Sequence, residues 1–227
     1  MSYRSLNVIK TKRYYLILPV FGILLFMVLY VAATFLYPGG SQTDIHSIGF
    51  SWSQNYWCNL LNEKAMNGAY NPARPLALTA LFILCSSLAY FWYLYPLQLP
   101  LGEKHRILIQ SSGILSMGTG MFVFTAPHDL TINIASFFGL VAMCGTFFTL
   151  YRWKWQRLLW LGFLNLLLVL LNNILYYGSG LLLYLPVVQK ISFLSFLIWI
   201  SLIDLKLFLL EPGQKGRRYP SDTASQI

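Results

Sequence analysis

The stretch YYLILPVFGILLFMVLYVAATFLY, residues 14–37, contains no charged side chain and is followed by Pro38. A run of this length is typical of a helix that crosses a bilayer, because about 20 apolar residues span the hydrocarbon layer. The whole composition agrees, since 57% of the 227 residues are hydrophobic and only 10% are charged. A soluble domain carries roughly 25% charged residues, so the sequence excludes a free soluble globule and predicts an integral membrane protein.

Five further apolar runs follow, divided by short polar corners or by glycine and proline. We expect membrane spans at 75–97, 107–126, 130–151, 158–177 and 181–210. Each is predicted to be a helix, because backbone groups in lipid need hydrogen-bond partners within their own segment. The predicted fold class is therefore all-α, a polytopic membrane protein with six transmembrane helices over 14–210. The basic segment 1–13 precedes this domain, and the polar composition of 211–227 predicts a disordered tail.

The distribution of basic residues predicts the orientation. Thirteen of the 16 lysines and arginines fall on the side that holds both termini: Arg4, Lys10, Lys12, Arg13, Lys104, Arg106, Arg152, Lys154, Arg157, Lys206, Lys215, Arg217 and Arg218. Only Lys64 and Arg74 fall on the other side. Basic flanks stay on the cytoplasmic side, so we expect a cell (inner) membrane protein with both termini cytoplasmic. The first run exceeds the apolar core of a signal peptide, about 7–15 residues, and is expected to remain as an anchor.

The longest polar connection, 38–74, is expected on the outer side and carries an amphipathic pattern. Its apolar stripe is Trp52, Tyr56, Trp57, Leu60 and Leu61, and its polar stripe is Asn55, Asn59, Asn62 and Glu63. The pattern predicts a helix of about four turns that lies along the membrane interface. Asn71 and Pro72 then predict the start of the next helix, as its cap and first turn. Such a loop either only seals the bundle or controls the entry of a ligand.

Lys190 is the most informative single residue, because it lies about ten positions inside the last apolar run. A charge at such depth costs roughly 2.5–3.5 kcal/mol, so an intramembrane lysine predicts a functional site with a partner. Asp129 and Glu63 are the candidate partners, and the alternative is that the side chain reaches the outer interface. The predicted ligand-binding set is Lys190, Gln189, Asn172, Asn173, Asn133, Glu63, Asn59 and Arg74. Asn165, seven residues before Asn172, continues its face deeper into the span.

His128 and Asp129 stand at the corner between the third and fourth runs, on the expected outer side. If the protein is an enzyme, His128 is the candidate base, Asp129 would orient it, and Lys190 would stabilise an anion. The alternative for Asp129 is structural, because a carboxylate interacts favourably with the positive end of a helix. Cys58 is a weaker candidate nucleophile, since the sequence indicates no activating neighbour.

The residue inventory excludes several kinds of site and partner. Of the three histidines, His105 is expected on the cytoplasmic side, so the three cannot share one zinc ion. No run has a histidine near its centre for haem, and no glycine-rich phosphate loop occurs. We therefore expect no metal and no cofactor. The basic residues do not alternate with exposed aromatic residues, so nucleic acid is not an expected partner.

Several short motifs occur in the order typical of one known family. Leu36-Tyr37-Pro38-Gly39 follows the first run, the loop ends at Asn71, a corner follows the third run, and Val188-Gln189-Lys190-Ile191 lies in the last run. Over 14–210 the chain resembles the domain-of-unknown-function family nine hundred and ninety-eight, six-helix prokaryotic membrane proteins distantly similar to the Frag/DRAM/Sfk group. The resemblance implies a six-helix fold and, through that group, a link to lipid remodelling. The chain departs from the family pattern in its longer loop and in the corner 127–129.

Three functions remain open at this point. The first is a protein that binds or modifies a lipid-like or anionic ligand, with membrane lipid as partner, in a pocket that opens to the extracytoplasmic side. The second is a transporter or channel component, although paired interrupted helices are absent from the sequence. The third is a non-catalytic subunit of a larger membrane complex, or a homo-oligomer. Ser112, Ser116 and Gly120 form a small-residue stripe that favours close helix packing.

Overall fold

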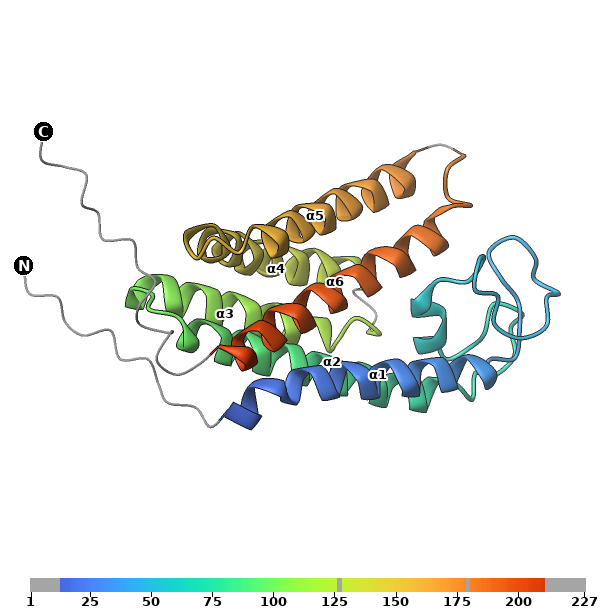
Figure 1. The fold of residues 1–227 in the computed structure, drawn as a ribbon. Coiled ribbons are helices and arrows are strands. Elements are labelled where there is room, and N and C mark those ends of the chain that lie inside the picture. Colours follow the sequence, from blue (N-terminus) through green and yellow to red (C-terminus); the bar gives the residue numbers. More distant parts are fainter. Residues whose placement is uncertain (1–12, 126–127, 179, 211–227) are drawn as a thin grey trace, which may run out of the picture.

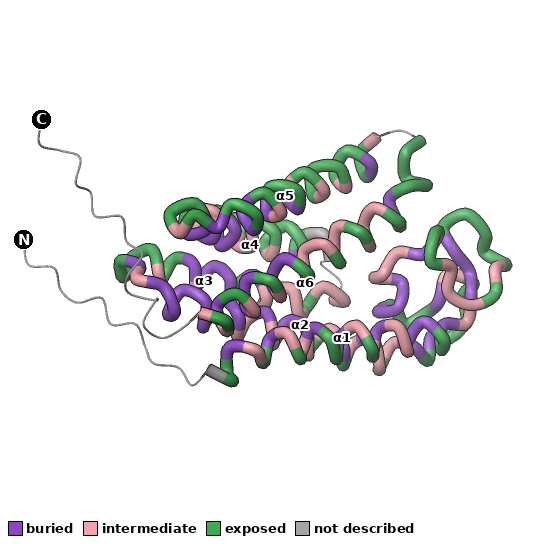
Figure 2. Tube along the Cα trace, viewed as in Figure 1, coloured by how far each residue is buried: buried purple, intermediate pink, exposed green. Residues whose placement is uncertain are grey.

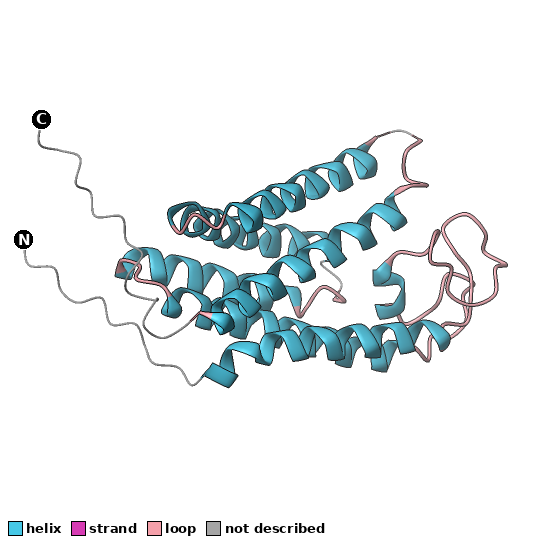
Figure 3. Ribbon diagram, viewed as in Figure 1, coloured by secondary structure: helices cyan, strands magenta, loops and turns pink. Residues whose placement is uncertain are grey.

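The computed structural model describes residues 13–125, 128–178 and 180–210, which fold as a helical bundle (Figure 1). The α-helices are α1 (Leu18–Phe35), α2 (Arg74–Leu94), α3 (Glu103–Gly120), α4 (His128–Arg152), α5 (Gln156–Tyr177) and α6 (Leu185–Leu209). Three short 3-10 helices are η1 (Arg13–Ile17), η2 (Trp57–Leu61) and η3 (Tyr95–Gln98). These residues contain no strand, and Figure 3 shows helices joined by loops. The all-α prediction is confirmed, whereas the predictions for 1–12 and 211–227 lie outside the described residues.

Five of the described helical segments are long and apolar enough to cross a membrane. They are Tyr14–Phe35, Arg74–Gln98, Leu130–Arg152, Gln156–Tyr177 and Leu185–Leu209. Exposed residues run along the outward side of α5 in Figure 2, and large apolar side chains such as Trp160 and Leu167 are among them. Exposed apolar surface on this scale suits contact with lipid, not water. The chain is therefore an α-helical polytopic membrane protein.

The third predicted span differs from the expected pattern. α3 ends at Gly120, and 121–125 form turns in place of the helix expected to reach 126. The apolar part of α3, 107–120, is about 21 Å long at 1.5 Å per residue, whereas the hydrocarbon layer is about 30 Å thick. Gln110 and Ser111 make this segment less apolar than the other helices. α3 packs between α2 and α4.

Small residues let α3 approach both neighbours closely. A Cβ atom on Gly113 would lie 2.2 Å from Cγ of Trp92 on α2, so glycine alone fits against that indole. On the other side, the Ser116 hydroxyl donates to the carbonyl oxygen of Ala135 on α4 at 2.7 Å. Ser112 and Ser116 are both buried. The packing role predicted for these two serines is confirmed.

The helices alternate in direction along the bundle. α1 packs on α2 and α5 on α6, and η1 contacts α6, so the start of α1 and the end of α6 lie at the same end. The loop 36–73 occupies the opposite end, at the right of Figure 1, which we call the loop end. Gln189 and Lys190 belong to the first turns of α6, close to this loop. The fold thus brings most of the predicted site residues to one end of the bundle.

Candidate functional site

The loop 36–73 is folded, but it does not form the predicted four-turn amphipathic helix. Its one helical segment is η2, five residues long. Isolated bridges join Gly39 to Ile48 and Lys64 to Tyr70, which gives the loop two cross-ties without a strand. The prediction is therefore corrected from a helix lying on the membrane to a compact, cross-tied loop.

The asparagine side chains explain this correction. The Asn55 carbonyl Oδ1 accepts a hydrogen bond from the backbone of Ser51, and its Nδ2 donates to the carbonyl of Gly40, both at 2.8 Å. Asn59 Oδ1 accepts from the backbone N–H of Tyr56 at 2.6 Å. Both Asn55 and Asn59, members of the predicted polar stripe, are buried. Asparagine competes with a helix for backbone groups, so these bonds favour turns over a continuous helix.

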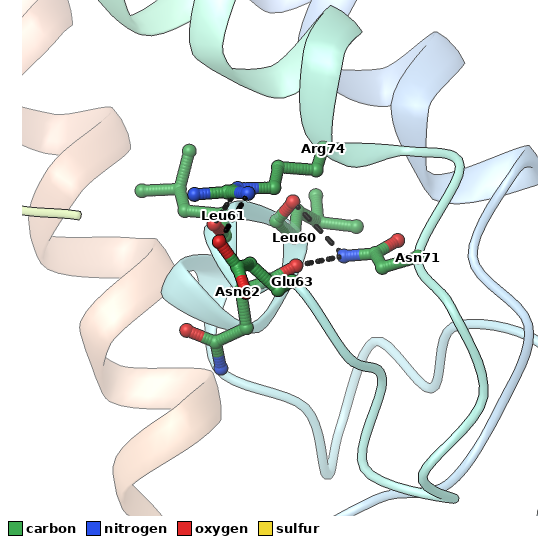
Figure 4. A network of polar contacts seen from close by, with 6 residues as sticks. All are labelled: Leu60, Leu61, Asn62, Glu63, Asn71 and Arg74. Carbon is green, nitrogen blue, oxygen red and sulfur yellow. Dashed lines mark hydrogen bonds and ion pairs between the residues drawn. The ribbon is translucent and has the colours of Figure 1, made fainter. Parts of the chain in front are cut away.

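Asn71 joins the end of the loop to η2 (Figure 4). Its Nδ2 donates to the carbonyl oxygens of Leu60 at 3.2 Å and Asn62 at 2.9 Å, and its Oδ1 accepts from the backbone of Ala73 at 3.1 Å. The side chain is completely buried. α2 begins only at Arg74, with Ala73 as its cap. Asn71 is therefore a buried link inside the loop and not the helix cap predicted from the sequence.

Arg74 and Glu63, two predicted ligand-binding residues, are paired with each other. Arg74 Nη1 lies 2.9 Å from Glu63 Oε1, and Arg74 Nε donates to the carbonyl oxygen of Leu61 at 3.1 Å. Figure 4 shows the arginine side chain reaching from α2 to the loop. The carboxylate is largely exposed, so the ion pair itself contributes little to stability, about 0–1 kcal/mol. In this arrangement the pair attaches the loop to α2.

Lys190 attaches the same loop to α6. Its ammonium group donates to the carbonyl oxygens of Asn55 at 2.5 Å and Pro186 at 2.9 Å, and it lies 5.7 Å from the centre of the Phe50 ring. Glu63, one of its two expected partners, pairs with Arg74 instead, and the side chain of Asp129, the other, lies outside the described atoms. Carbonyl oxygens and an aromatic face thus compensate the cost of the charge in place of a carboxylate.

Gln189 and Phe193 connect the loop to the interior of the bundle. Gln189 Oε1 accepts from the backbone N–H of Trp57 at 3.3 Å. The Trp57 indole stacks on Tyr30 of α1, with ring centres 4.8 Å apart, and lies 5.6 Å from the Phe193 ring. The Tyr30 hydroxyl donates to the carbonyl oxygen of Trp57 at 2.9 Å. Trp57 is consequently held between α1 and α6 at the inner side of the loop.

A cavity of about 400 Å³ lies on the bundle side of these contacts. Its volume falls in the range of small-molecule sites, about 300–1,000 Å³. The cavity is bordered by Trp92 of α2, by Ser116 and Met117 of α3, by Ala135, Ser136, Gly139, Leu140 and Met143 of α4, by Asn165, Leu166, Val169 and Asn172 of α5, and by Gln189, Ser192, Phe193 and Phe196 of α6. Of the predicted ligand-binding set, the structure brings Asn172 and Gln189 together here.

Several residues that border this cavity carry buried hydrogen-bonding groups without partners. Among the described residues, five buried side-chain nitrogen or oxygen atoms have no hydrogen-bond partner: Trp57 Nε1, Trp92 Nε1, Asn165 Oδ1, Asn172 Oδ1 and Asp204 Oδ2. Trp92, Asn165 and Asn172 border the cavity. Buried polar groups are normally satisfied, so each exception calls for an explanation such as a bound molecule. Trp92 was missed at the sequence level because nothing in a single apolar helix shows which of its faces meets a cavity.

The remaining predicted site residues are not part of the cavity wall. Asn133 and Asn173 are exposed, and Asn173 Nδ2 donates to the carbonyl oxygen of Val169 within its own helix. His128 begins α4 and Asp129 follows it. The side chains of these two lie outside the described part, so the predicted base and its orienting carboxylate stay a prediction.

A second pocket, of about 380 Å³, lies beneath the loop. It is bordered by Gln42, Tyr56, Cys58, Asn59, Leu61, Asn62, Met66, Val123, Phe124 and Thr125. Burial raises the pKa of the Cys58 thiol, and nearby Lys190 lowers it by less. A raised pKa leaves less of the reactive thiolate at neutral pH. The environment of Cys58 is thus the opposite of the one that activates a catalytic cysteine.

The described residues contain no cluster of three or more histidine, cysteine or acidic side chains that could hold a metal ion. The candidate site is therefore the cavity bordered by α2 to α6, with the loop attached above it through Gln189 and Lys190.

Comparison with known proteins adds no relative, since no family model, no curated protein and no solved structure matches this chain.

Proposed function

We propose that this membrane protein binds a lipid-like amphiphile in the cavity bordered by α2 to α6. One observation carries the proposal: three of the five unpartnered buried polar atoms belong to residues that border this one cavity. The rest of the wall is largely apolar, with residues such as Leu140, Val169 and Phe196. A mostly apolar cavity with a few polar groups is typical of sites for amphiphilic small molecules.

The surroundings of Lys190 favour the lipid-like ligand over an anionic one. Its ammonium group already donates to two carbonyl oxygens, and Lys190 is not among the residues that border the cavity. Two of the three N–H donors of the ammonium group are therefore already used within the protein, and the charge does not form part of the cavity wall. We assign Lys190 a structural role, in which it holds the loop against α6 at the edge of the site.

We place the protein in the cell (inner) membrane with both termini cytoplasmic and the loop on the extracytoplasmic side. The proposal rests on the excess of lysine and arginine at the terminal side of the bundle. The even number of antiparallel helices agrees with it, because the start of α1 and the end of α6 share one end. The proposed cavity then extends from below the loop to the middle of the membrane.

Photolabelling tests the proposal directly. Purified protein in lipid nanodiscs is irradiated with long-chain alkyl probes that carry a diazirine and end in either a hydroxyl or a carboxylate, and labelled peptides are mapped by mass spectrometry. We expect labels on the parts of α4, α5 and α6 that border the cavity. Labelling confined to outward-facing residues, for both probes, would contradict a ligand site in the bundle.

A matched pair of variants controls for incidental labelling. Leu166 borders the cavity, whereas its neighbour Leu167 faces outward and is 62% exposed. Leu166→Trp adds volume to the cavity wall and is expected to reduce labelling of the cavity peptides several-fold. Leu167→Trp adds the same group to the lipid-facing surface and should leave the labelling unchanged. Equal labelling in both variants would count against the proposed site.

A further inference from the structure

The two asparagines that border the cavity leave the amide oxygen, not the nitrogen, without a partner. Asn165 Nδ2 donates to the carbonyl oxygen of Leu161 at 3.0 Å, and Asn172 Nδ2 donates to that of Leu168 at 2.8 Å. A backbone carbonyl only accepts hydrogen bonds, so each amide must turn its nitrogen toward the helix. The oxygen of each amide is then left over, and both oxygens are buried without a partner.

The asparagine with a bonded nitrogen and an unpaired oxygen occurs twice on α5, two helical turns apart. Asn165 and Asn172 are seven residues apart, so they share one face, about 10 Å apart along the axis. Asn165 is the deeper of the two and is 98% buried, with 2% of its surface exposed. Asn172 Nδ2 also donates to the Ser192 hydroxyl at 2.5 Å, and that hydroxyl donates to the carbonyl oxygen of Val188. Ser192 therefore has its own acceptor and leaves the oxygen of Asn172 unpaired.

The cavity wall carries no charge to select an ionic ligand. None of the residues that border it is lysine, arginine, histidine, aspartate or glutamate. A carboxylate or phosphate ligand would meet two amide oxygens, which are acceptors like itself, and would lose its hydration without gaining a cation. Among the buried side-chain atoms without a partner, the indole Nε1 of Trp92 is the one donor that belongs to a residue at this wall.

We propose that the ligand of this cavity is an uncharged amphiphile whose polar group is a hydroxyl or an amide. The inference rests on the proposed function and narrows it to one class of ligand. A hydroxyl or an N–H-bearing amide donates to an asparagine oxygen and can also accept from an indole N–H, so it satisfies both kinds of free group. An ether or ester oxygen can only accept, and an anion would bring a charge that nothing at the wall compensates.

Competition among three matched ligands tests the proposal. Labelling of the cavity by the diazirine alcohol is measured in the presence of an unlabelled alcohol, its methyl ether and the carboxylate of the same chain length. We expect the alcohol to compete at roughly a tenfold lower concentration than the ether, because an unpaired buried acceptor costs about 1–3 kcal/mol. We expect the carboxylate to compete more weakly than the alcohol.

Two variants test whether the preference for the alcohol over the ether depends on the oxygen of Asn165. Asn165→Leu removes the deep oxygen and should bring the alcohol and the ether close to equal, with most of the tenfold preference lost. Asn173→Leu makes the same change at an exposed position outside the cavity and should keep the preference. Asn165→Leu should keep the fold, because the one bond that it removes, from Nδ2 to the carbonyl oxygen of Leu161, lies within α5, where that carbonyl keeps its place in the helix.

The outcomes separate the inference from the proposed function. If the cavity is labelled but the ether or the carboxylate competes as well as the alcohol in the wild-type protein, this inference is wrong and the proposed function stands. If no probe labels the cavity, the proposed function fails and the inference fails with it. A preference for the alcohol that survives Asn165→Leu and Asn172→Leu together would also overturn the assignment to the asparagine oxygens.

Discussion

Asparagine side chains shape both the loop and the cavity, but their amide groups are bonded differently in the two places. In the loop, the buried amide groups of Asn55 and Asn71 use both their nitrogen and their oxygen for backbone partners. On α5, Asn165 and Asn172 use the nitrogen alone. A fully satisfied amide stabilises a local structure, whereas a half-satisfied one leaves free energy that a ligand can recover.

Asn71→Ala tests whether the fully bonded amide of Asn71 stabilises the loop. The change leaves the carbonyls of Leu60 and Asn62 without their donor in a buried environment. We expect a loss of about 2–4 kcal/mol in the free energy of unfolding, measured by thermal or chemical unfolding in detergent. Asn67→Ala is the control, because Asn67 is exposed and makes one local bond to the backbone of Ala69. Equal losses in the two variants would contradict the central role of Asn71.

Cys58 gives a prediction on pH dependence. Burial raises the pKa of this thiol, so the folded protein keeps its proton at a pH where an unfolded thiol, with pKa about 8.5, has begun to lose it. Alkylation by iodoacetamide at about pH 8 is therefore expected to be slower in the folded protein than after denaturation. The contribution of this thiol to stability is fully present below about pH 8.5 and is lost as the pH rises further. In Cys58→Ser this loss should disappear, and a folded-state alkylation rate equal to the denatured one would contradict the prediction.

At the scale of elements, α3 depends on its neighbours more than the other helices do. It is the shortest in apolar length and is not among the segments able to cross a membrane alone. Its position is fixed by close contacts, with Gly113 against Trp92 on one side and Ser116 bonded to Ala135 on the other. Because Trp92 and Ser116 also border the cavity, the packing of α3 sets part of the shape of the site.

Gly113→Ala tests this packing. The added Cβ would lie 2.2 Å from the indole of Trp92, and the ring has to move. We expect destabilisation by about 1–3 kcal/mol, the range for overpacking a buried contact. Gly118→Ala on the same helix has no atom within 4 Å of the new Cβ, and it should be neutral or slightly stabilising because alanine favours helices. Thermal unfolding of both variants measures the difference, and destabilisation by Gly118→Ala alone would exclude this model of α3.

Lys190→Met tests the attachment of the loop to α6. The variant loses two bonds from the ammonium group, each worth about 1.5–3 kcal/mol, but also removes a charge that costs roughly 2.5–3.5 kcal/mol in the membrane. The two bonds sum to about 3–6 kcal/mol and the removed charge offsets much of this, so the unfolding free energy should fall by at most about 3 kcal/mol. Hydrogen exchange in the loop around Asn55 should become faster. Lys64→Met, at an exposed position in the same loop, should leave exchange there unchanged.

At the scale of the whole molecule, the proposed orientation predicts which residues water-soluble reagents can reach from outside the cell. Ile45 is exposed in the loop, and Glu103 is exposed at the opposite end of the bundle. In a background with the native cysteines changed to serine, a membrane-impermeant maleimide should label Ile45→Cys in intact cells. The same reagent should label Glu103→Cys only after permeabilisation, and the reverse pattern would show that the orientation is inverted.

The sequence by itself determined the all-helical membrane architecture, because long uncharged runs such as 14–37 leave a chain in lipid no other way to satisfy its backbone. It also pointed to Asn172 and Gln189, because polar groups inside apolar runs are conspicuous. It could not show that the loop asparagines turn inward to backbone carbonyls, or that Lys190 finds oxygens of the loop. Those contacts join residues far apart in the chain, such as Asn55 and Lys190. Only the tertiary structure decided them, since the partners of a buried polar group depend on which helices and loops pack together.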